Sequence, residues 1–586
     1  MKDSMTTEVL IIGGGPTGMV SGLCLAKLGI RNIILERRAT LMEHPKAHEL
    51  SARSIEILQD LGFSYEELAE EASDKNTAAR ILFCNSINEE YGRIDLRANG
   101  IEEKYKQHLR SPEPYLNISQ TELERVMRRH IEKSQTKLLL NHQWESFTQE
   151  ADGVNCIVRR LSDGTSTAIK SRYVICADGA GGRTRLALGI KMHGPERIQD
   201  FVNAYFTNDL SEYVNTTAKL YWICKPECAG TFIAHHPKKR WVYHLPIYPP
   251  YEKVEDYTPE ILQLRIRDAL AAPNMDIQIE SISHWRMTAQ VAERFRQENC
   301  FLVGDTAHRF PPTGGLGMNS GIGDAHNLCW KLKAVLREGA NPALLDTYET
   351  ERRPVIERNC EESRRNYQDI FAVPGVLGAN PDKLEKLAVL MSYVPLRFLP
   401  NAWKKALTRR FLKLVGYFAT RSYKKPGVSA HMQETIAAQI GHFDRIGLDL
   451  GYSYTNSKMN QPSNRVTEYQ PNTKPGSRFP HFPIDQEGLL SSHEYLDYNS
   501  WTLWLGTSTE KWTTTITLSK RLPTVKVIQI EYKSMAWQHL GISSDGAVLV
   551  RPDGHVAWRT SSTNNLRKDL QTALEKIFIL KTVQKN

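Results

Sequence analysis

The chain has 586 residues, of which 41% are apolar and 24% charged, with a formal net charge of +9. This length exceeds one compact core and predicts roughly three or four domains of ordinary globular composition. No apolar run spans a bilayer, and Val9–Ile12 is too short for a signal-peptide core, so we expect a cytoplasmic protein. The nine scattered cysteines predict reduced thiols, and Cys224 and Cys228 lack the second ligand pair of a zinc site.

The first predicted unit is a strand, a glycine-rich turn, a helix and a second strand. An apolar strand at Thr7–Ile12 leads into Gly13-Gly14-Gly15-Pro16-Thr17-Gly18, and apolar residues at helical spacing follow over Met19–Leu28. A second apolar strand, Asn32–Leu35, ends at Glu36. This order is typical of a dinucleotide-binding βαβ unit.

Each part of this unit has a physical role at a bound dinucleotide. Gly13 permits the tight turn, Gly15 lets the backbone approach a pyrophosphate, and Gly18 lets the helix pack closely on the strand. The helix N-terminus offers free N–H groups to the phosphates. Glu36 is placed to accept hydrogen bonds from the adenosine ribose, and its charge disfavours the 2′-phosphate of NADP there. The fingerprint alone does not separate FAD from NAD.

A second motif lies near the middle of the chain. The predicted strand Cys300–Val303 ends at Gly304-Asp305, and a loop with Gly314, Gly315 and Gly317 precedes a long apolar-faced helix. Asp305 can accept hydrogen bonds from ribityl hydroxyls, and the glycine loop can bring backbone N–H groups to a flat ring. Because those groups begin a helix, they would stabilise negative charge on the ring.

A third motif lies between the other two. The predicted strand Tyr173–Ala177 is followed by Asp178-Gly179 and, a few residues later, by Arg185. An Asp-Gly pair after a strand is by itself only a turn signal. Its place in the order of the three motifs gives it significance.

The three motifs, in this order, resemble those of the single-component (class A) FAD-dependent aromatic hydroxylases, the group of phenol, dichlorophenol and aromatic-polyketide hydroxylases. The resemblance covers nearly the whole chain and extends to Ile118-Ser119-Gln120 and to the C-terminal Arg551–Arg559. Two residues depart from the family pattern. Lys46 stands where an arginine is usual, and Gly182 replaces a usual serine.

The resemblance implies a fold and a reaction. The fold is α/β, with a Rossmann-type FAD-binding domain interleaved with a β-sheet substrate domain and followed by a C-terminal thioredoxin-like α/β domain. FAD stays bound, whereas NADPH or NADH docks transiently as the reductant. Dioxygen then forms a C4a-hydroperoxyflavin that hydroxylates an electron-rich aromatic ring. A homodimer is plausible by the same resemblance.

The resemblance also assigns residues to FAD, whereas no metal site is expected and no catalytic residue is identified. The expected contacts are Gly13, Gly15, Gly18, Glu36 and Arg37 at the ADP half; Lys46 and Gln120 at the pyrophosphate–ribityl region; Asp305 at the ribityl chain; Gly315, Gly317, Met318 and Asn319 at the ring edge; Asp178 at the closure toward the nicotinamide; and the Pro312 carbonyl near the reacting centre.

Alternating apolar stretches predict the substrate sheet. Its candidates for pocket lining or phenol deprotonation are Tyr221, Trp222, His235, His236, Tyr243 and His244, although packing on a sheet face is the commoner role for such residues. We predict the following layout: 1–80, 105–200 and 290–375 as the FAD-binding domain; 81–104 and 201–289 as the substrate domain; 376–430 as a helical connection; and 431–586 as the thioredoxin-like domain. The last unit has no cysteine, so it has no dithiol chemistry.

One basic segment, Leu396–Lys425, mixes leucines, Phe411, Phe418 and Trp403 with many lysines and arginines. A basic amphipathic helix can lie on an anionic membrane. The pattern favours instead a helix that packs on the FAD-binding domain or on a dimer partner, since Trp403 and the leucines also suit a core face. Nucleic-acid binding is not expected, because the basic cluster is confined to this segment.

Other functions stay open on this scaffold. A Baeyer–Villiger-type oxygenation is one alternative, and a non-catalytic FAD-binding protein is another. A flavin halogenase is disfavoured because its W-x-W-x-I-P signature is absent. Substrate identity and the choice of NADH or NADPH do not follow from the sequence.

Overall fold

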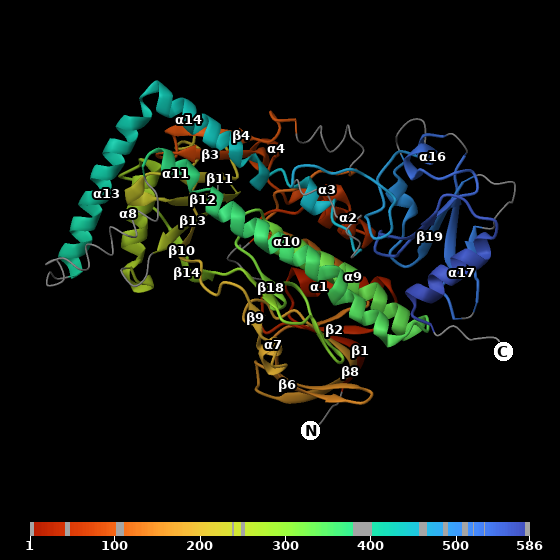
Figure 1. Ribbon diagram of the computed structural model, residues 1–586. Coiled ribbons are helices and arrows are strands. Elements are labelled where there is room, and N and C mark those ends of the chain that lie inside the picture. Colours follow the sequence, from red (N-terminus) through yellow and green to blue (C-terminus); the bar gives the residue numbers. More distant parts are fainter. Residues whose placement is uncertain are drawn as a thin grey trace.

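The computed structural model describes residues 5–40, 47–100, 111–236, 239–247, 252–378, 401–455, 466–484, 490–506, 514–519, 521–531 and 534–580. These residues form an α/β fold with two large sheets and a smaller C-terminal sheet, joined by long helices that run along the molecule (Figure 1). None of the described helices is both long and apolar enough to cross a membrane.

The first large sheet has eight strands around a parallel centre. Its order is β16-β17-β8-β1-β2-β5, and β7 and β6 extend it alongside the first half of β8. The central strands are short apolar runs that are buried on both faces, as expected for parallel strands covered by helices. The bounds are β1 (Met5–Ile12), β2 (Asn32–Leu35), β5 (Lys137–Leu139), β6 (His142–Glu150), β7 (Gly153–Arg160), β8 (Ser166–Cys176), β16 (Arg296–Gln297) and β17 (Cys300–Leu302).

The second large sheet has seven strands in the order β14-β10-β13-β12-β11-β3-β4. Only the β11–β3 pair is parallel, so an early segment of the chain completes a sheet formed mainly by residues 199–287. Helix α8 covers one face, where an apolar cluster forms around Trp241, Leu262 and Ile266 (Figure 1). The bounds are β3 (Arg80–Cys84), β4 (Glu90–Asp95), β10 (Gln199–Phe206), β11 (Leu220–Ile223), β12 (Gly230–His236), β13 (Arg240–Ile247) and β14 (Ile279–Met287).

Two smaller sheets complete the strands. One is a three-stranded sheet in the order β18-β15-β9. The other is a five-stranded mixed sheet, β20-β21-β19-β22-β23, which forms the C-terminal unit. In the latter only β19 and β21 are parallel. The bounds are β9 (Met192–His193), β15 (Gln290–Ala292), β18 (His308–Arg309), β19 (Trp501–Leu505), β20 (Thr515–Ile516), β21 (Val525–Gln529), β22 (Ala547–Val550) and β23 (Val556–Thr560).

The helices carry the connections between these sheets. The long helices α9 and α10 run side by side across the molecule (Figure 1). The bounds are α1 (Pro16–Lys27), α2 (Ala52–Asp60), α3 (Tyr65–Glu70), α4 (Lys75–Ala79), α6 (Gln120–Lys133), α7 (Arg183–Ala187), α8 (Pro259–Leu270), α9 (Leu316–Arg337), α10 (Thr347–Asp369), α11 (Ala372–Val376), α13 (Asn401–Tyr423), α14 (Pro426–Ala437), α15 (Ile446–Asp449), α16 (Met535–Leu540) and α17 (Leu566–Ile577).

Buried ion pairs attach the C-terminal unit to the rest of the chain. Glu56 on α2 accepts hydrogen bonds from Arg53 Nη1 and Arg478 Nε, each at 2.9 Å. Arg551 donates to Glu351 on α10, with Nη1 2.7 Å from Oε1. All five side chains are largely shielded from water. The attachment is therefore ionic as well as apolar.

Candidate active site

Four parallel strands end at the same edge of the first sheet. Ile12 of β1 pairs with Leu35 of β2 on one side and with Cys176 of β8 on the other, and Cys176 also pairs with Leu302 of β17. The ends of β1 and β17 are thus two strands apart, about 10 Å. The turns predicted at Gly13, Glu36, Asp178 and Asp305 all leave from this edge, where parallel α/β sheets bind their ligands.

Two glycines of the first turn are required by packing. A Cβ on Gly13 would lie 2.2 Å from the Ala177 carbonyl oxygen, and one on Gly18 would lie 1.9 Å from the Gly13 carbonyl oxygen. Gly15 differs, since a Cβ there would meet no atom within 4 Å. Its backbone faces open space, which is what close approach by a ligand requires.

The start of α1 touches both the Gly304 turn and helix α9. A Cβ on Gly304 would lie 2.7 Å from Thr17 Oγ1, and one on Gly321 would lie 2.3 Å from the same oxygen. The first and second sequence motifs, about 290 residues apart in the chain, therefore pack directly on each other. Glycine at both positions permits this contact.

Helices α1 and α9 both begin without a side-chain cap. Their N-cap residues are Gly15 and Gly315, which accept no hydrogen bond through a side chain. By contrast, Ser51 and Ser119 cap α2 and α6. The first-turn N–H groups of α1 and α9 thus stay available to an anionic ligand, and both helices point their positive dipole ends at the same edge.

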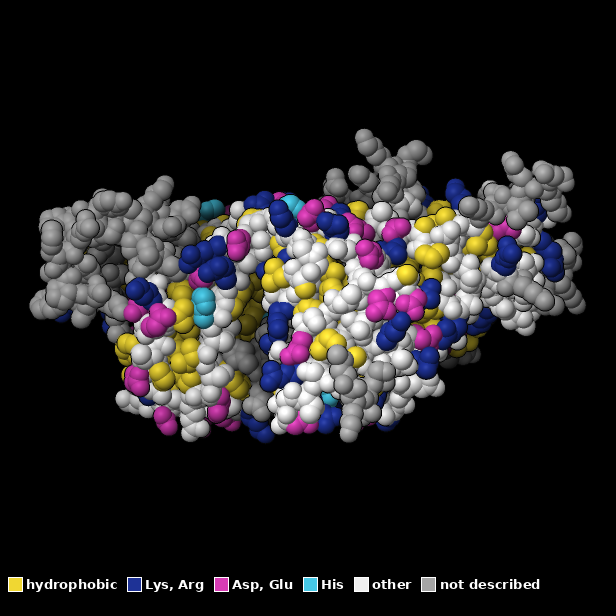
Figure 2. All heavy atoms as spheres, turned by 90° about the horizontal axis from the view of Figure 1, so that it is seen from below, with side chains coloured by type: hydrophobic (Ala, Val, Ile, Leu, Met, Phe, Trp, Pro, Cys, Tyr) yellow, Lys and Arg dark blue, Asp and Glu magenta, His cyan; other side chains and the backbone are white. Residues whose placement is uncertain are grey.

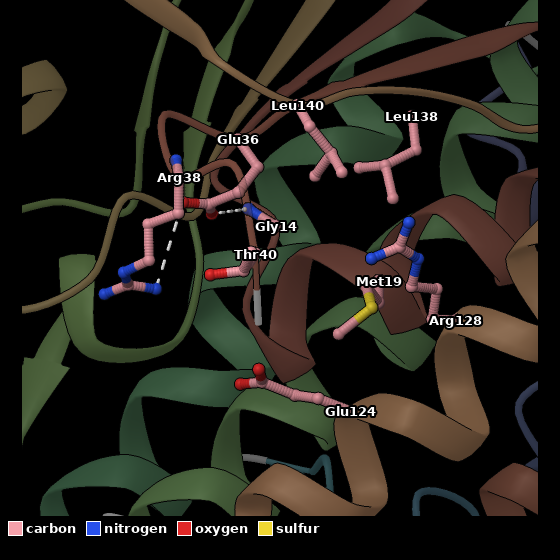
Figure 3. Close-up of a pocket in the computed structure, with 9 residues that line it drawn as sticks. All are labelled: Gly14, Met19, Glu36, Arg38, Thr40, Glu124, Arg128, Leu138 and Leu140. Atoms are coloured by element: carbon pink, nitrogen blue, oxygen red, sulfur yellow. Dashed lines mark hydrogen bonds and ion pairs between the residues drawn. The ribbon is translucent and has the colours of Figure 1, made fainter. Parts of the chain in front are cut away.

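A pocket opens beside the α1 turn (Figure 3). The Glu36 carboxylate accepts hydrogen bonds from the backbone N–H groups of Gly14 and Arg38, each at 2.9 Å. These bonds fix the acid at the end of β2. Arg37 is exposed, and its neighbour Arg38 lines the pocket instead. The full lining is Gly14, Met19, Glu36, Arg38, Thr40, Glu124, Arg128, Leu138 and Leu140.

Helix α6 supplies one wall of this pocket. Gln120 is its first residue, and its side chain donates to Glu124 Oε1 at 2.7 Å. Glu124 and Arg128 line the pocket one and two turns later (Figure 3). The resemblance extended to Glu124, but only Gln120 was assigned to FAD and Arg128 was missed, although their four-residue spacing already places all three on one helix face. Lys46 lies outside the described residues.

The second and third motifs are joined by hydrogen bonds. Asp178 accepts from Thr184 N at 3.0 Å and from Thr306 Oγ1 at 3.2 Å. Thr306 Oγ1 in turn accepts from Gly179 N at 3.0 Å. Asp178 therefore holds the Asp-Gly turn against the turn that carries Asp305, which is itself exposed at the sheet edge.

Asp324 on α9 holds the Gly304 turn in place. Its Oδ2 accepts from Gly304 N at 3.0 Å and lies 2.6 Å from His308 Nε2, while Oδ1 accepts from Arg352 Nε at 2.8 Å. Burial opposes ionisation of Asp324, but His308 and Arg352 lower its pKa to about 2. Sequence reasoning missed this residue because nothing local marks it among the apolar positions of α9.

Some of the predicted FAD contacts around the start of α9 are already hydrogen-bonded or packed within the chain, whereas others are open. The Pro312 carbonyl accepts from Gly315 N at 3.1 Å, which closes the turn, and Met318 packs partly on the core. The Asn319 side chain donates to the Glu49 and Gly315 carbonyls and accepts from Ser51 N and Ser54 Oγ. It therefore ties α9 to residues 49–54. Gly317 is open, since a Cβ there would meet only Phe310, at 3.9 Å.

A buried charge cluster backs this loop. The Arg445 guanidinium lies 3.5 Å from where a Cβ of Gly315 would be, and it pairs with Glu49 at 2.6 Å and Asp449 at 3.5 Å. Lys219, which precedes β11, completes the cluster. The region after α14 thus contributes to the surroundings of the α9 N-terminus.

Comparison with known families identifies the family to which the chain belongs. The family of the FAD binding domain matches residues 6–363, and the family of the aromatic-ring hydroxylase C-terminal region matches residues 472–579. The chain belongs to the FAD-dependent aromatic-ring hydroxylases. The first match contains every FAD contact that the sequence predicted, and the two uncapped helix starts with open Gly15 and Gly317 fit a dinucleotide that ends in a flat ring.

Individual hydroxylases resemble the chain along most of its length. It is 27% identical to a 2,4-dichlorophenol 6-monooxygenase of Cupriavidus pinatubonensis over 99% of this chain and 97% of that protein. It is 33% identical to an aklavinone 12-hydroxylase of Streptomyces peucetius over 66% and 79%. A flavin-dependent monooxygenase, PieE, solved in complex with FAD and substrate, superposes with a TM-score of 0.81 at 28% identity, over 98% of this chain and 99% of that chain.

Two of the hydroxylase's pocket candidates belong to the core instead. Tyr221 and Tyr243 are fully buried on the α8 side of the second sheet. The Tyr221 hydroxyl donates to the Thr216 carbonyl, and that of Tyr243 donates to the Cys228 carbonyl. Burial raises the pKa of both phenols, so neither supplies a phenolate base.

The opposite face of the second sheet carries aromatic and histidine side chains. The His235 ring lies 5.7 Å from that of His48, and His244 accepts from Trp285 Nε1 at 3.1 Å. Burial lowers the pKa of His244 to about 3, so it is neutral at physiological pH. Trp222 stacks on Phe83, and its buried indole N–H has no hydrogen-bond partner within the described residues. The side chain of His236 lies outside them.

Proposed function

We propose that this hydroxylase inserts one oxygen atom of O₂ into a phenolic or polyketide aromatic ring, with NADPH or NADH as the reductant. The observation that carries the proposal is the pair of uncapped helix starts, α1 at Gly15 and α9 at Gly315, at one edge of one sheet. Relatives named for dichlorophenol, phenol and aklavinone support the substrate class.

We infer the following placement of FAD. The α1 N-terminus with Gly13, Gly15 and Gly18 holds the pyrophosphate, and Glu36 receives the adenosine ribose. Arg128 adds a cation from α6, beyond the predicted Gln120, Arg37 and Lys46. Asp305 accepts from the ribityl chain, Asp178 supports its turn, and the α9 start from Pro312 through Gly315, Gly317, Met318 and Asn319 borders the ring.

FAD supplies the redox chemistry, namely acceptance of two electrons from NAD(P)H and activation of dioxygen. The chain's own residues bind, orient and shield. The first-turn N–H groups of α9 stabilise negative charge at the ring edge that they face. The face of the second sheet with Trp222, His235 and His244 holds the aromatic substrate, and its apolar surroundings keep water away from the reacting atoms.

We further infer a thioredoxin-like architecture for the C-terminal unit, supported by its mixed five-stranded sheet with α16 and α17. It has no cysteine and therefore no dithiol chemistry, and we assign it a structural or interfacial role. A cytoplasmic location is supported by nine free, buried thiols.

A panel of phenols and polyketide aromatics tests the reaction. We expect a purified yellow holoenzyme in which one compound class accelerates NAD(P)H oxidation, consumes oxygen and yields a product heavier by one oxygen atom. A ring-opened or lactone product would favour the Baeyer–Villiger alternative. Bound FAD without any accelerating aromatic compound would favour a non-catalytic flavoprotein.

A further inference from the structure

Helix α13 projects along the outer edge of the molecule beside the second sheet (Figure 1). It packs inward through small residues. A Cβ on Gly416 would lie 2.6 Å from Glu227 Oε2, and Ala419 is 5% exposed. The Tyr423 hydroxyl donates to the Tyr91 carbonyl at 3.1 Å. The inward face therefore uses little of the helix's apolar surface.

Three large apolar side chains of α13 face outward. Leu414, Tyr417 and Phe418 are 53%, 59% and 59% exposed, and their spacing of three and four residues puts them on one face. The sequence pattern favoured a helix that packs through Trp403 and its leucines on the FAD-binding domain or on a dimer partner. The structure instead places these three in contact with water, while Trp403 and residues 396–400 lie outside what is described.

Basic side chains continue the same exposed stripe at both ends. Arg410, Lys413 and Arg421 recur at the same three- and four-residue steps on α13, and Lys424 and Lys425 follow directly after its last residue; all five are exposed. No acidic residue occurs in the sequence from 401 to 433. The face shown in Figure 2 has a different character, because acidic and basic side chains are interspersed across it. The stripe thus combines exposed apolar groups with charge of one sign.

Exposed apolar groups beside positive charge favour one kind of partner over two others. A second copy of the stripe would bring cations against cations, and a nucleic acid would neutralise the cations but leave the three apolar side chains in water. An anionic bilayer satisfies both, since aromatic and aliphatic groups enter the headgroup boundary while lysine and arginine meet lipid phosphates. We propose that the outward face of α13 docks the enzyme onto an anionic lipid surface.

Vesicle flotation of the intact holoenzyme tests this docking. We expect binding to phosphatidylcholine vesicles that contain phosphatidylserine, weaker binding at high salt, and little binding to phosphatidylcholine alone. Lys413→Gln with Lys424→Gln should weaken binding by about fivefold per lost charge. Tyr417→Ser with Phe418→Ser should weaken it while keeping the charge. NAD(P)H oxidation in solution should match wild type in both variants.

Matched controls distinguish binding through this face from nonspecific binding through charged or apolar groups elsewhere on the surface. Lys568→Gln with Lys576→Gln on α17 removes two exposed charges elsewhere, and Leu161→Ser with Leu490→Ser removes two exposed apolar groups. Both should bind vesicles as wild type does. The proposal fails if wild type does not float with anionic vesicles, if the α13 variants float as well as the controls, or if Tyr417→Ser with Phe418→Ser instead dissociates a dimer.

Discussion

Lys219 Nζ lies 2.9 Å from Glu49 Oε2, and this ion pair is almost fully shielded from water. Lys219 precedes β11 of the second sheet, and Glu49 lies just before α2, next to the start of α9. Burial opposes the charge on Glu49, but Arg445 and Lys219 lower its pKa to about 2. The pair therefore fixes the second sheet relative to the N-terminal end of α9 at one ionic contact.

Removing the cation of this pair should be costly. Lys219→Met leaves Glu49 with a single cation in a buried site, so we expect a loss of about 3 kcal/mol or more in the free energy of unfolding. Denaturant titration of the holoenzyme measures it. Arg364→Met breaks the exposed Arg364–Glu361 pair and should cost less than about 1 kcal/mol. Equal losses in both variants would contradict a special role for Lys219.

Asp449 gives the same cluster a dependence on pH. Burial raises its pKa to about 6, although Arg445 acts in the opposite direction. A raised pKa means that folding binds a proton, so this contribution is complete below about pH 4 and is lost as pH rises through about 6. On going from pH 4.5 to pH 7.5, Asp449→Asn should therefore gain stability relative to wild type, by at most roughly 3 kcal/mol.

Melting temperatures of holoenzyme at these two pH values check this sign. Asp163→Asn, at an exposed turn, serves as the control because the pKa of Asp163 is lowered by hydrogen bonds from Thr165. It should show no gain over wild type on going to the higher pH. A constant difference between Asp449→Asn and wild type at both pH values would rule out the predicted titration.

Substitutions at Gly15 and Gly321 should distinguish an effect on FAD binding from an effect on stability. Gly15→Val adds a side chain into open space, so the chain should fold and melt near the wild-type apoprotein yet retain little FAD. Gly321→Ala forces a Cβ against Thr17 and should lower both stability and flavin content, by about 1–3 kcal/mol in the former. Thr17→Ala should partly rescue Gly321→Ala. Flavin absorbance and thermal melts report the two properties; an FAD-replete Gly15→Val protein would exclude the placement proposed for the pyrophosphate.

Asp324→Asn tests how the Gly304 turn is held. The amide cannot pair with Arg352 as an ion, and its single oxygen cannot serve both Gly304 and Arg352 as the carboxylate does. We expect FAD affinity to fall about 10- to 100-fold, the value of one or two charge-assisted hydrogen bonds. Fluorescence titration of FAD into apoprotein measures it. Asp346→Asn, on an exposed pair with Arg296, should leave the affinity unchanged.

Local sequence signals predicted the elements that form the edge. The strand Asn32–Leu35 was predicted with its observed bounds, and Thr7–Ile12 only lacked two N-terminal residues of β1. Such strands are readable because a short apolar run bounded by glycine has few other solutions. Asp324 and Lys219 were not readable, because their partners lie 16 to 170 residues away and no periodicity records such contacts.

The substrate sheet shows the same limit in another form. Alternation correctly indicated strands around Tyr221 and Tyr243, but it could not tell which of the two faces meets α8. Helix α13 adds a further case, since a basic apolar pattern is equally compatible with burial and with exposure. In both cases, which face is buried depends on the elements that pack against it in the folded chain.

Glu56 and Glu351 each pair with an arginine from the last quarter of the chain, Arg478 and Arg551 respectively. A protein shortened before Arg478 would leave those two carboxylates stranded in the interior with part of their countercharge gone. The flavin-binding half is therefore not a self-sufficient module that happens to carry an appendage. A shortened enzyme should therefore fold only if those two acids are replaced as well.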